Sequence, residues 1–306
     1  MFLSRNPISS IHSDALHSLS HDLIDLRISR CRLEVISNNF LSEMSNLIQL
    51  DLSENFINTL GDSTFYGCPN LVDLRLWGNQ INILTNKTFY GLRNLERLDL
   101  SYNELEEILP GHLWSLKTIT TLDLSGNRLR ALKNRTFEQL TNLKKLFVDR
   151  NRLKIIQTEA LKGLSNLQVL TIQFNSISTL YDGSFKFLSN LQYLDLSSNE
   201  IQVLWRKTFY GLAKLFWLRL SNNRVTELHD DTFHYTKVLK LLEMDANKLK
   251  RITSIQVKSV NLTTLSLLQN DLECNCESFW LKIGQVYGYC EKDSKIFVLG
   301  LEFDWC

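Results

Sequence analysis

The sequence predicts an α/β solenoid, in which short repeating units stack to form a parallel β-sheet backed by loops. Three observations predict it. An asparagine recurs at one constant step, as at positions 55, 79 and 103, leucine-type residues keep fixed offsets around it, and a phenylalanine recurs with the same period. A repeat of this length is one structural unit that buries its apolar face only by stacking on its neighbours.

The repeating unit reads L-x-x-L-x-L-x-x-N-x-L. Its asparagines are Asn55, Asn79, Asn103, Asn127, Asn151, Asn175, Asn199, Asn223 and Asn247. The pattern extends to residues 23–33, where Cys31 takes the asparagine slot, and to residues 262–272, where the step is 23, giving eleven complete units. The L-x-L alternation places both leucines on one face of a short strand and the residues between them on the other.

Two further side chains hold the unit together. The asparagine amide can satisfy backbone groups of the turn in its own unit and in the next one, which suits a chain with only 12 glycines and 3 prolines. An aromatic spine is expected in the opposite wall, and leucine takes its slot at positions 113 and 161. The spine phenylalanines are Phe65, Phe89, Phe137, Phe185, Phe209 and Phe233. Cys31 and Cys68 both take core slots, so we expect them to be buried and unreactive.

These residues resemble the leucine-rich-repeat family, and the resemblance covers essentially the whole chain. It implies an α/β leucine-rich-repeat solenoid, a right-handed curved horseshoe with a concave parallel sheet, a loop-rich convex side and a disulfide-bonded C-terminal cap. The expected organisation is a solenoid over residues 1–272, made of a partial first repeat plus eleven repeats, and a cap over residues 273–306.

The cap rests on Cys274, Cys276, Cys290 and Cys306, which resemble the C-terminal cysteines of extracellular members of the family. The resemblance implies the pairs Cys274–Cys290 and Cys276–Cys306, whereas the sequence alone leaves three pairings open. A zinc site is the competing interpretation, but Cys-x-Cys is not the usual knuckle spacing. A helix is expected over Ser278–Tyr289, with Phe279, Ile283, Val286 and Tyr287 on one side.

The opening residues MFLSRNPI follow the same pattern. Met1, Leu3, Asn6 and Ile8 fall in slots of a twelfth, incomplete repeat, and no signal-peptide pattern precedes the first full unit. The interpretation is that the natural N-terminus, with a signal peptide, lies upstream. The alternative is an intact protein with an uncapped end.

Composition excludes several classes of function. A formal net charge of +1 gives no basic excess for nucleic acid or an anionic membrane, and no apolar run reaches the roughly 20 residues that span a bilayer. The sequence has no G-x-S-x-G, P-loop or H-E-x-x-H motif, so we expect that the protein is not an enzyme and binds neither a cofactor nor a metal. The only histidine cluster is His12, His17 and His21, and a solvated loop is its favoured interpretation.

The expected location is extracellular or at the cell surface. Four paired cysteines imply an oxidising compartment. Glycosylation sequons at Asn86, Asn134 and Asn261 agree with it, and the first two occupy one slot two repeats apart, on the outer wall.

A partner is expected on the concave face, where side chains depart from the L-D-L-S consensus. The predicted partner-binding residues are Arg75, Trp77, Arg97, Lys145, Phe147, Asp149, Tyr193, Trp217 and Arg219. Thr171, Gln173 and Glu243 also depart from it, whereas Asp51, Asp99, Asp123 and Asp195 match it and are expected to be ordinary solvated carboxylates. Large aromatic residues and arginine are the usual anchors of protein interfaces.

The predicted function is therefore extracellular recognition, similar to Toll-type receptor ectodomains, Slit-like guidance proteins and secreted invertebrate immune proteins. The expected partner is a protein, with a glycan as an alternative, and a dimer is a further possibility. The second hypothesis is a structural, matrix or adhesion scaffold without a signalling ligand. An intracellular scaffold is the third.

Overall fold

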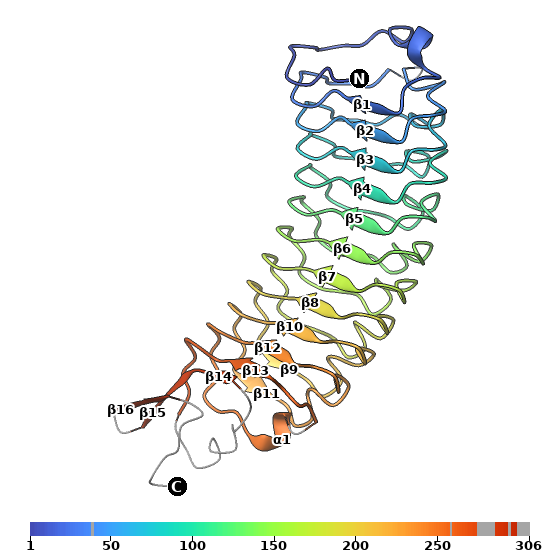
Figure 1. Ribbon diagram of the computed structural model, residues 1–306. Helices are drawn as coiled ribbons and strands as arrows, with labels where there is room; N and C mark the ends of the chain where they lie inside the picture. Colours follow the sequence, from blue (N-terminus) through green and yellow to red (C-terminus); the bar gives the residue numbers. More distant parts are fainter. Residues whose placement is uncertain (38–39, 258, 274–284, 293–294, 299–306) are drawn as a thin grey trace. The chain divides into compact units, whose positions relative to one another are not determined.

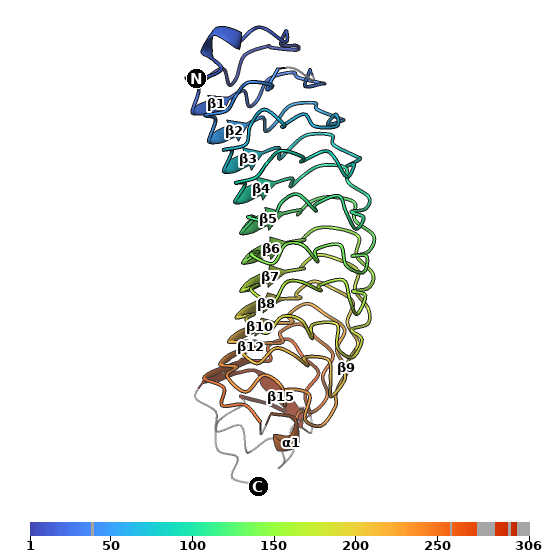
Figure 2. The same ribbon diagram turned by 90° about the vertical axis from the view of Figure 1, so that its right-hand side faces the viewer.

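The computed structural model describes residues 1–37, 40–257, 259–273, 285–292 and 295–298 (Figure 1). The chain divides into two compact units. Unit 1 comprises Met1–Arg152 with Ala160–Leu164, and unit 2 comprises Leu153–Glu159 with Ser165–Cys306. Each unit is a stack of coils in which short strands follow one side and return segments the other (Figure 2), so the predicted parallel-strand solenoid is confirmed. The described residues contain almost no helix.

The described residues of unit 1 contain six strands, each paired in parallel with the next in the register of the sequence repeat, so that Leu26 lies beside Leu50 and Leu50 beside Leu74. They are β1 (Asp25–Arg27), β2 (Gln49–Asp51), β3 (Asp73–Arg75), β4 (Arg97–Asp99), β5 (Thr121–Asp123) and β6 (Lys145–Phe147). The central leucine of every strand is buried.

The first coil of unit 1 continues this arrangement. The opening residues extend the sheet, because the Leu3 N–H donates to the Arg27 carbonyl at 2.8 Å and Phe2 bridges Arg27 in parallel. A 3-10 turn, η1 (His17–Leu19), lies in the first return segment. The partial repeat read from the sequence thus occupies a strand position beside β1.

Unit 2 continues the pattern. Its sheet contains β7 (Val169–Thr171), β8 (Tyr193–Asp195), β10 (Trp217–Arg219), β12 (Leu241–Glu243), β13 (Thr264–Ser266) and β14 (Gln285–Tyr287). The return segments hold β9 (Val203–Leu204), β11 (Glu227–Leu228) and the single-turn helix α1 (Ser254–Val257). An antiparallel hairpin of β15 (Tyr289–Lys292) and β16 (Lys295–Val298) follows β14.

The helix predicted over Ser278–Tyr289 is wrong in its last part. β14 pairs in parallel with β13, so Val286 takes the register position of the strand leucines beside Leu265. A β-branched residue suits this strand position better than a helix. Cys274, Cys276 and Cys306 lie outside the described residues, so the disulfide pairs and the boundary at residue 272 stay predictions.

The core contains the predicted spine. All six spine phenylalanines are fully buried, as is Leu161, and Leu113 is 1% exposed. Neighbouring rings stack almost parallel, with centroids 6.3 Å apart for Phe65 and Phe89 in unit 1. In unit 2, Phe209 stacks on both sides, 6.5 Å from Phe185 and 5.8 Å from Phe233.

The predicted burial of the two core cysteines is confirmed. Cys31 and Cys68 are 6% and 0% exposed, and both are free thiols. Burial raises the pKa of Cys68 to about 12, so its thiol stays protonated and unreactive at neutral pH.

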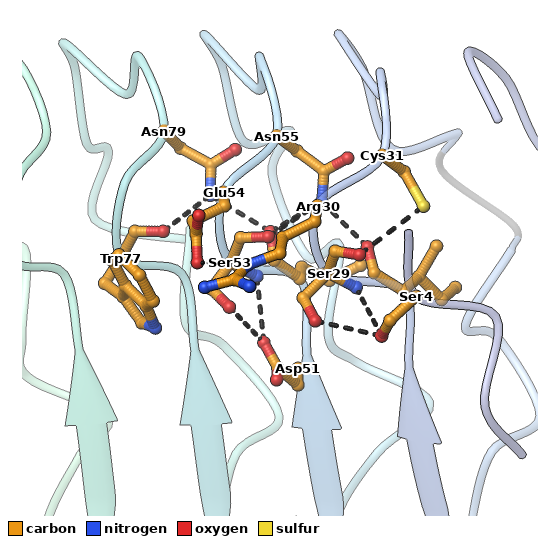
Figure 3. A network of polar contacts seen from close by, with 12 residues as sticks. Ser4, Ser29, Arg30, Cys31, Asp51, Ser53, Glu54, Asn55, Trp77 and Asn79 are labelled. Atoms are coloured by element: carbon orange, nitrogen blue, oxygen red, sulfur yellow. Dashed lines mark hydrogen bonds and ion pairs between the residues drawn. The ribbon is translucent and has the colours of Figure 1, made fainter. Parts of the chain in front are cut away.

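The asparagines form a hydrogen-bonded ladder (Figure 3). The Asn55 amide donates to the Leu52 carbonyl of its own coil at 3.0 Å and to the Ile28 carbonyl of the preceding coil at 2.8 Å. Its oxygen accepts the Leu33 N–H, also of the preceding coil, at 3.1 Å. The sequence-based expectation of bonds to the next coil is therefore wrong in direction. Ile28 lies just after β1. Its carbonyl accepts a hydrogen bond from the asparagine side chain of the next coil instead of from a strand N–H.

The residue before each asparagine adopts the left-handed conformation. Only two of these residues are glycine in the described ladder, Gly78 and Gly126, whereas Tyr102 has φ 52° and Phe174 has φ 54°. This conformation costs a non-glycine residue about 1–2 kcal/mol. The ladder bonds on either side of the turn offset this cost, which explains how the chain turns with few glycines.

Candidate functional site

Each strand presents three slots on the side of the sheet away from the leucine core, namely its first residue, its third residue and the residue two positions further on. We call these side chains the strand face. Unit 1 places six predicted partner-binding residues on it: Arg75, Trp77, Arg97, Lys145, Phe147 and Asp149. Unit 2 places the other three there: Tyr193, Trp217 and Arg219. All nine are exposed or half-buried.

The strand face of unit 1 is organised around Asp73, whose side chain is only 7% exposed. Arg75 donates hydrogen bonds to both carboxylate oxygens of Asp73, at 3.3 and 3.0 Å. Arg97 on the next strand donates to the same carboxylate at 3.3 Å. Two predicted partner-binding arginines are therefore held together by a carboxylate that the sequence analysis missed. The signal for Asp73 was an acidic residue two positions before one arginine and one repeat before another.

The two aromatic residues of this face are not brought together. Trp77 follows β3 and is half-buried beside the ladder (Figure 3), whereas Phe147 ends β6, with β4 and β5 between them. Any partner that contacts both must therefore span several strands, at about 4.8 Å per strand.

The consensus aspartates of unit 1 are more constrained than predicted. Asp99 and Asp123 are half-buried, and each accepts the backbone N–H and hydroxyl of the serine two positions on, at 2.9 and 2.6 Å. Asp51 binds Ser53 in the same way (Figure 3). Burial raises the pKa of Asp123, the bonds from Ser125 oppose this, and the neighbouring Asp99 adds to the rise.

Replacing Asp123 with asparagine is expected to raise the thermal midpoint at pH 7 by about 1–2 °C. The amide keeps an oxygen for Ser125 and removes a half-buried charge that lies beside Asp99. The penalty of this charge appears as pH rises through the unfolded-state pKa, about 3.9, and is complete above the raised folded-state value. The gain should therefore vanish at pH 3, as thermal unfolding followed by circular dichroism can show.

Asp51→Asn is the matched control. Asp51 makes the same contacts with Ser53, but its register partners are Arg27 and Arg75. Removing this charge should lower the midpoint or leave it unchanged, because two cations flank it. A rise equal to that of Asp123→Asn would contradict the assignment of the effect to Asp99 and burial.

The strand face of unit 2 carries a closed network, which we call the Tyr193 cluster: Tyr193, Asp195, Trp217, Arg219 and Glu243. Arg219 donates to Asp195 at 3.0 Å and to Glu243 at 2.8 Å. The Tyr193 hydroxyl donates to Asp195 at 3.0 Å, and the Trp217 indole donates to Glu243 at 2.9 Å. The two aromatic rings meet edge to face, with centroids 5.0 Å apart.

This cluster corrects one expectation. Asp195 was expected to be an ordinary solvated carboxylate, but it is 1% exposed. Arg219 and Tyr193 cover it, and the Ser197 N–H bonds it at 2.9 Å, so the buried charge is paired. Burial raises the pKa of Tyr193, which keeps its hydroxyl protonated as a donor.

The three sequon asparagines are exposed in the described part of the chain. Thr88 and Thr136, which complete the first two sequons, are 0% and 5% exposed. A buried threonine or serine precedes each spine phenylalanine at positions 64, 88, 136, 184, 208 and 232. Packing alone therefore accounts for the threonine in these two sequons. Only the asparagine of each sequon is evidence for glycosylation.

The histidine cluster lies in the first return segment. The side chains of His12 and His17 are 80% and 69% exposed, and His17 lies 3.1 Å from Glu43. The described residues contain no group of three or more histidine, cysteine or acidic side chains placed to hold a metal ion. Among them, no helix has the length and apolar character needed to cross a membrane.

Comparison with known proteins supports the fold. A family described as leucine rich repeat matches residues 22–81, 69–129, 117–177 and 165–225, which together span most of the chain. No curated protein matches the sequence.

Three solved structures share the fold. The APL1 leucine-rich repeat domain is 20% identical, with a TM-score of 0.75, over 94% of this chain and 71% of that one. An internalin, InlF, from Listeria monocytogenes is 19% identical, with a TM-score of 0.67, over 92% and 85%. TLR13, in its complex with ssRNA13, is 24% identical, with a TM-score of 0.62, over 95% of this chain and 54% of its own. This chain therefore spans about half of the TLR13 chain.

Proposed function

The chain belongs to the leucine-rich-repeat family, and we propose that it is a non-enzymatic extracellular recognition module that binds a protein through its strand face. It would act as a receptor ectodomain or as a secreted immune or adhesion protein. The observation that carries the proposal is the Tyr193 cluster, in which two aromatic rings and an arginine lie half-exposed on adjacent strands and are fixed by mutual contacts.

Residue type and rigidity both support this use of the cluster. Tryptophan, tyrosine and arginine are enriched among residues that dominate binding energy. Side chains already fixed before binding lose less conformational entropy when a partner docks, so preorganisation raises affinity. In unit 1, the ion pairs around Asp73 fix Arg75 and Arg97 in the same way.

Mixed charge favours a protein over a polyanion. On the third-residue slots of unit 1, Arg27, Asp51 and Arg75 alternate in sign, followed by Asp99 and Asp123. A nucleic acid needs an excess of cations along its path. The extracellular location is supported by the cysteine pattern of residues 274–306 and by the sequon asparagines.

Pairs of substitutions drawn from the chain itself test the binding face. Trp77→Ser with Phe147→Thr gives unit 1 the residues that the same slots hold as Ser53 and Thr171. Tyr193→Val with Trp217→Leu gives unit 2 the residues of Val169 and Leu241. After a screen of extracellular proteins with the full chain, at least one pair should weaken binding of the partner about tenfold or more.

The control is Tyr181→Ser, which changes a 49% exposed aromatic residue on a return segment of unit 2. It should leave affinity unchanged, and thermal unfolding should show that each variant is folded before binding is measured. Wild-type affinity for both pairs would contradict a strand-face site. If no protein in the screen bound the chain but an RNA did in a separate binding assay, a protein partner would be contradicted. If neither bound, a matrix scaffold would be favoured.

A further inference from the structure

An aromatic stack stands on the outer wall of unit 1, away from the strand face. Tyr66, Tyr90 and Trp114 follow one another at the step of the repeat and are 58%, 42% and 40% exposed. Their ring centroids are 5.7 and 6.0 Å apart, with interplanar angles of 19° and 28°. Core packing does not explain these rings, because each lies immediately after a buried spine position and projects outwards.

Trp114 ends this stack and reaches back to a sequon. Its indole N–H donates to the backbone carbonyl of Asn86 at 2.6 Å, across 28 residues. Tyr90 packs against the ring from the same coil as Asn86. The indole is therefore fixed against the backbone of Asn86, whose side chain is exposed. Its N–H is already bonded, and Trp114 remains 40% exposed, so apolar ring surface is open to solvent.

We propose that Trp114 is the docking platform for the first N-acetylglucosamine of a glycan on Asn86. The proposal rests on the extracellular location proposed above. A transferase would join Asn86 Nδ2 to C1 of a lipid-linked oligosaccharide, so that one amide proton and the lipid pyrophosphate leave. The sugar presents a face of C–H groups, which packs on an aromatic ring as other apolar groups do. Its hydroxyls and acetamide stay at the solvent-exposed side.

The buried threonine fixes the order of events. Thr88 is fully buried, and its hydroxyl oxygen accepts the Thr85 N–H at 2.8 Å. The hydroxyl that completes the sequon is therefore out of reach once this coil has folded. Glycosylation must precede folding, and Trp114 then closes on the sugar as the next coil stacks.

Asn261 in unit 2 supplies a matched control within the same chain. There too a side chain donates to the carbonyl of the sequon asparagine, but the donor is the Lys240 ammonium, at 2.9 Å. The two sequons thus share a similar contact and differ in the ring. A sugar on Asn261 would have the same covalent link without an aromatic platform from that donor.

The test uses the full chain, secreted from cells that add N-linked glycans and trimmed enzymatically to single N-acetylglucosamine residues. Mass spectrometry should find a sugar on Asn86. In NMR spectra, the acetyl methyl group of that sugar should be shifted upfield by the ring current of Trp114, relative to the sugar on Asn261. Trp114→Leu should abolish the shift, and Trp114→Phe, which keeps a ring but not the N–H donor, should retain part of it.

Several results would overturn the proposal. They are an unmodified Asn86 in the secreted protein, an unshifted methyl resonance, or a shift that survives Trp114→Leu. Because Trp114 lies outside the core, the leucine variant should remain folded, and the Phe variant provides a second reading if it does not. The strand-face binding assay reads a different surface, so its failure and the failure of this proposal can be told apart. A chain that is not exported would fail both.

Discussion

Phe209→Ala is expected to lower the free energy of unfolding by about 3–5 kcal/mol, as large-to-small substitutions of buried phenylalanine do. Phe209 is fully buried and is stacked against Phe185 on one side and Phe233 on the other. Removing its ring leaves a cavity between two coils and deletes both ring contacts. The coils cannot close this space readily, because strand pairing on the opposite side fixes their separation. Urea unfolding, followed by circular dichroism, measures the loss.

Phe209→Leu separates ring volume from burial. The same slot holds leucine at positions 113 and 161, where it is buried without a stacked ring. A leucine at position 209 fills most of the space and should cost less than half of the alanine variant. If the leucine and alanine variants lost the same free energy of unfolding, the cause would be the lost ring contacts and not the cavity.

Asn103→Asp is expected to destabilise the fold at pH 7 by about 3–5 kcal/mol, the cost of an uncompensated buried charge. The Asn103 amide donates to the carbonyls of Leu76, Leu100 and Ser101, at 2.9, 3.1 and 3.2 Å. A carboxylate of the same shape would instead place an anion against three carbonyl oxygens. It would keep only the acceptor for the Ile81 N–H.

The pH dependence identifies this mechanism. Burial and the facing carbonyls would raise the folded-state pKa of the new carboxyl, so its penalty grows as pH rises through the unfolded-state value, about 3.9, and is complete above the folded-state value. Denaturant unfolding should therefore show a smaller loss at pH 4 than at pH 7. Asn103→Ala is the control, with a loss of about 2–4 kcal/mol that does not change with pH. A pH-independent loss for Asn103→Asp would contradict the charge-based account.

The fold could be predicted from the sequence because its determinants are periodic. One constant step fixes the strand register, the spine and the ladder together, so a chance agreement of all three is excluded. The direction of the ladder was not predictable in the same way. The direction of the ladder depends on which backbone carbonyl has no strand N–H as a partner after each strand ends. The course of the backbone decides this, and the presence of an asparagine in the sequence does not reveal it.

The strand face was predicted only in part. Periodicity placed Tyr193, Trp217 and Arg219 in outward slots, but not their contacts with Asp195 and Glu243. Such contacts depend on which side chains meet across strands of neighbouring repeats and on their rotamers. The contact of Trp114 with Asn86 spans 28 residues and was missed for the same reason. The helix expected at residues 285–289 failed because a short apolar pattern does not separate a helix from a strand.

One irregularity shows where this chain tolerates change. The step from β12 to β13, which pairs Leu242 with Leu265, is one residue shorter than the step from β10 to β12, which pairs Leu218 with Leu242. Both strands nevertheless keep their pairing, and Asn270 still donates to the Met244 carbonyl at 2.9 Å. The missing residue is absorbed in the return segment, where α1 ends at Val257 in the slot of the aromatic spine.

The segment of each coil from strand to asparagine thus keeps a constant number of residues, whereas the return segment can lose one. Grafted loops, epitope tags or engineered insertions should therefore be placed in the return segments. A single residue added between strand and asparagine would displace the side chains of every later slot in that coil.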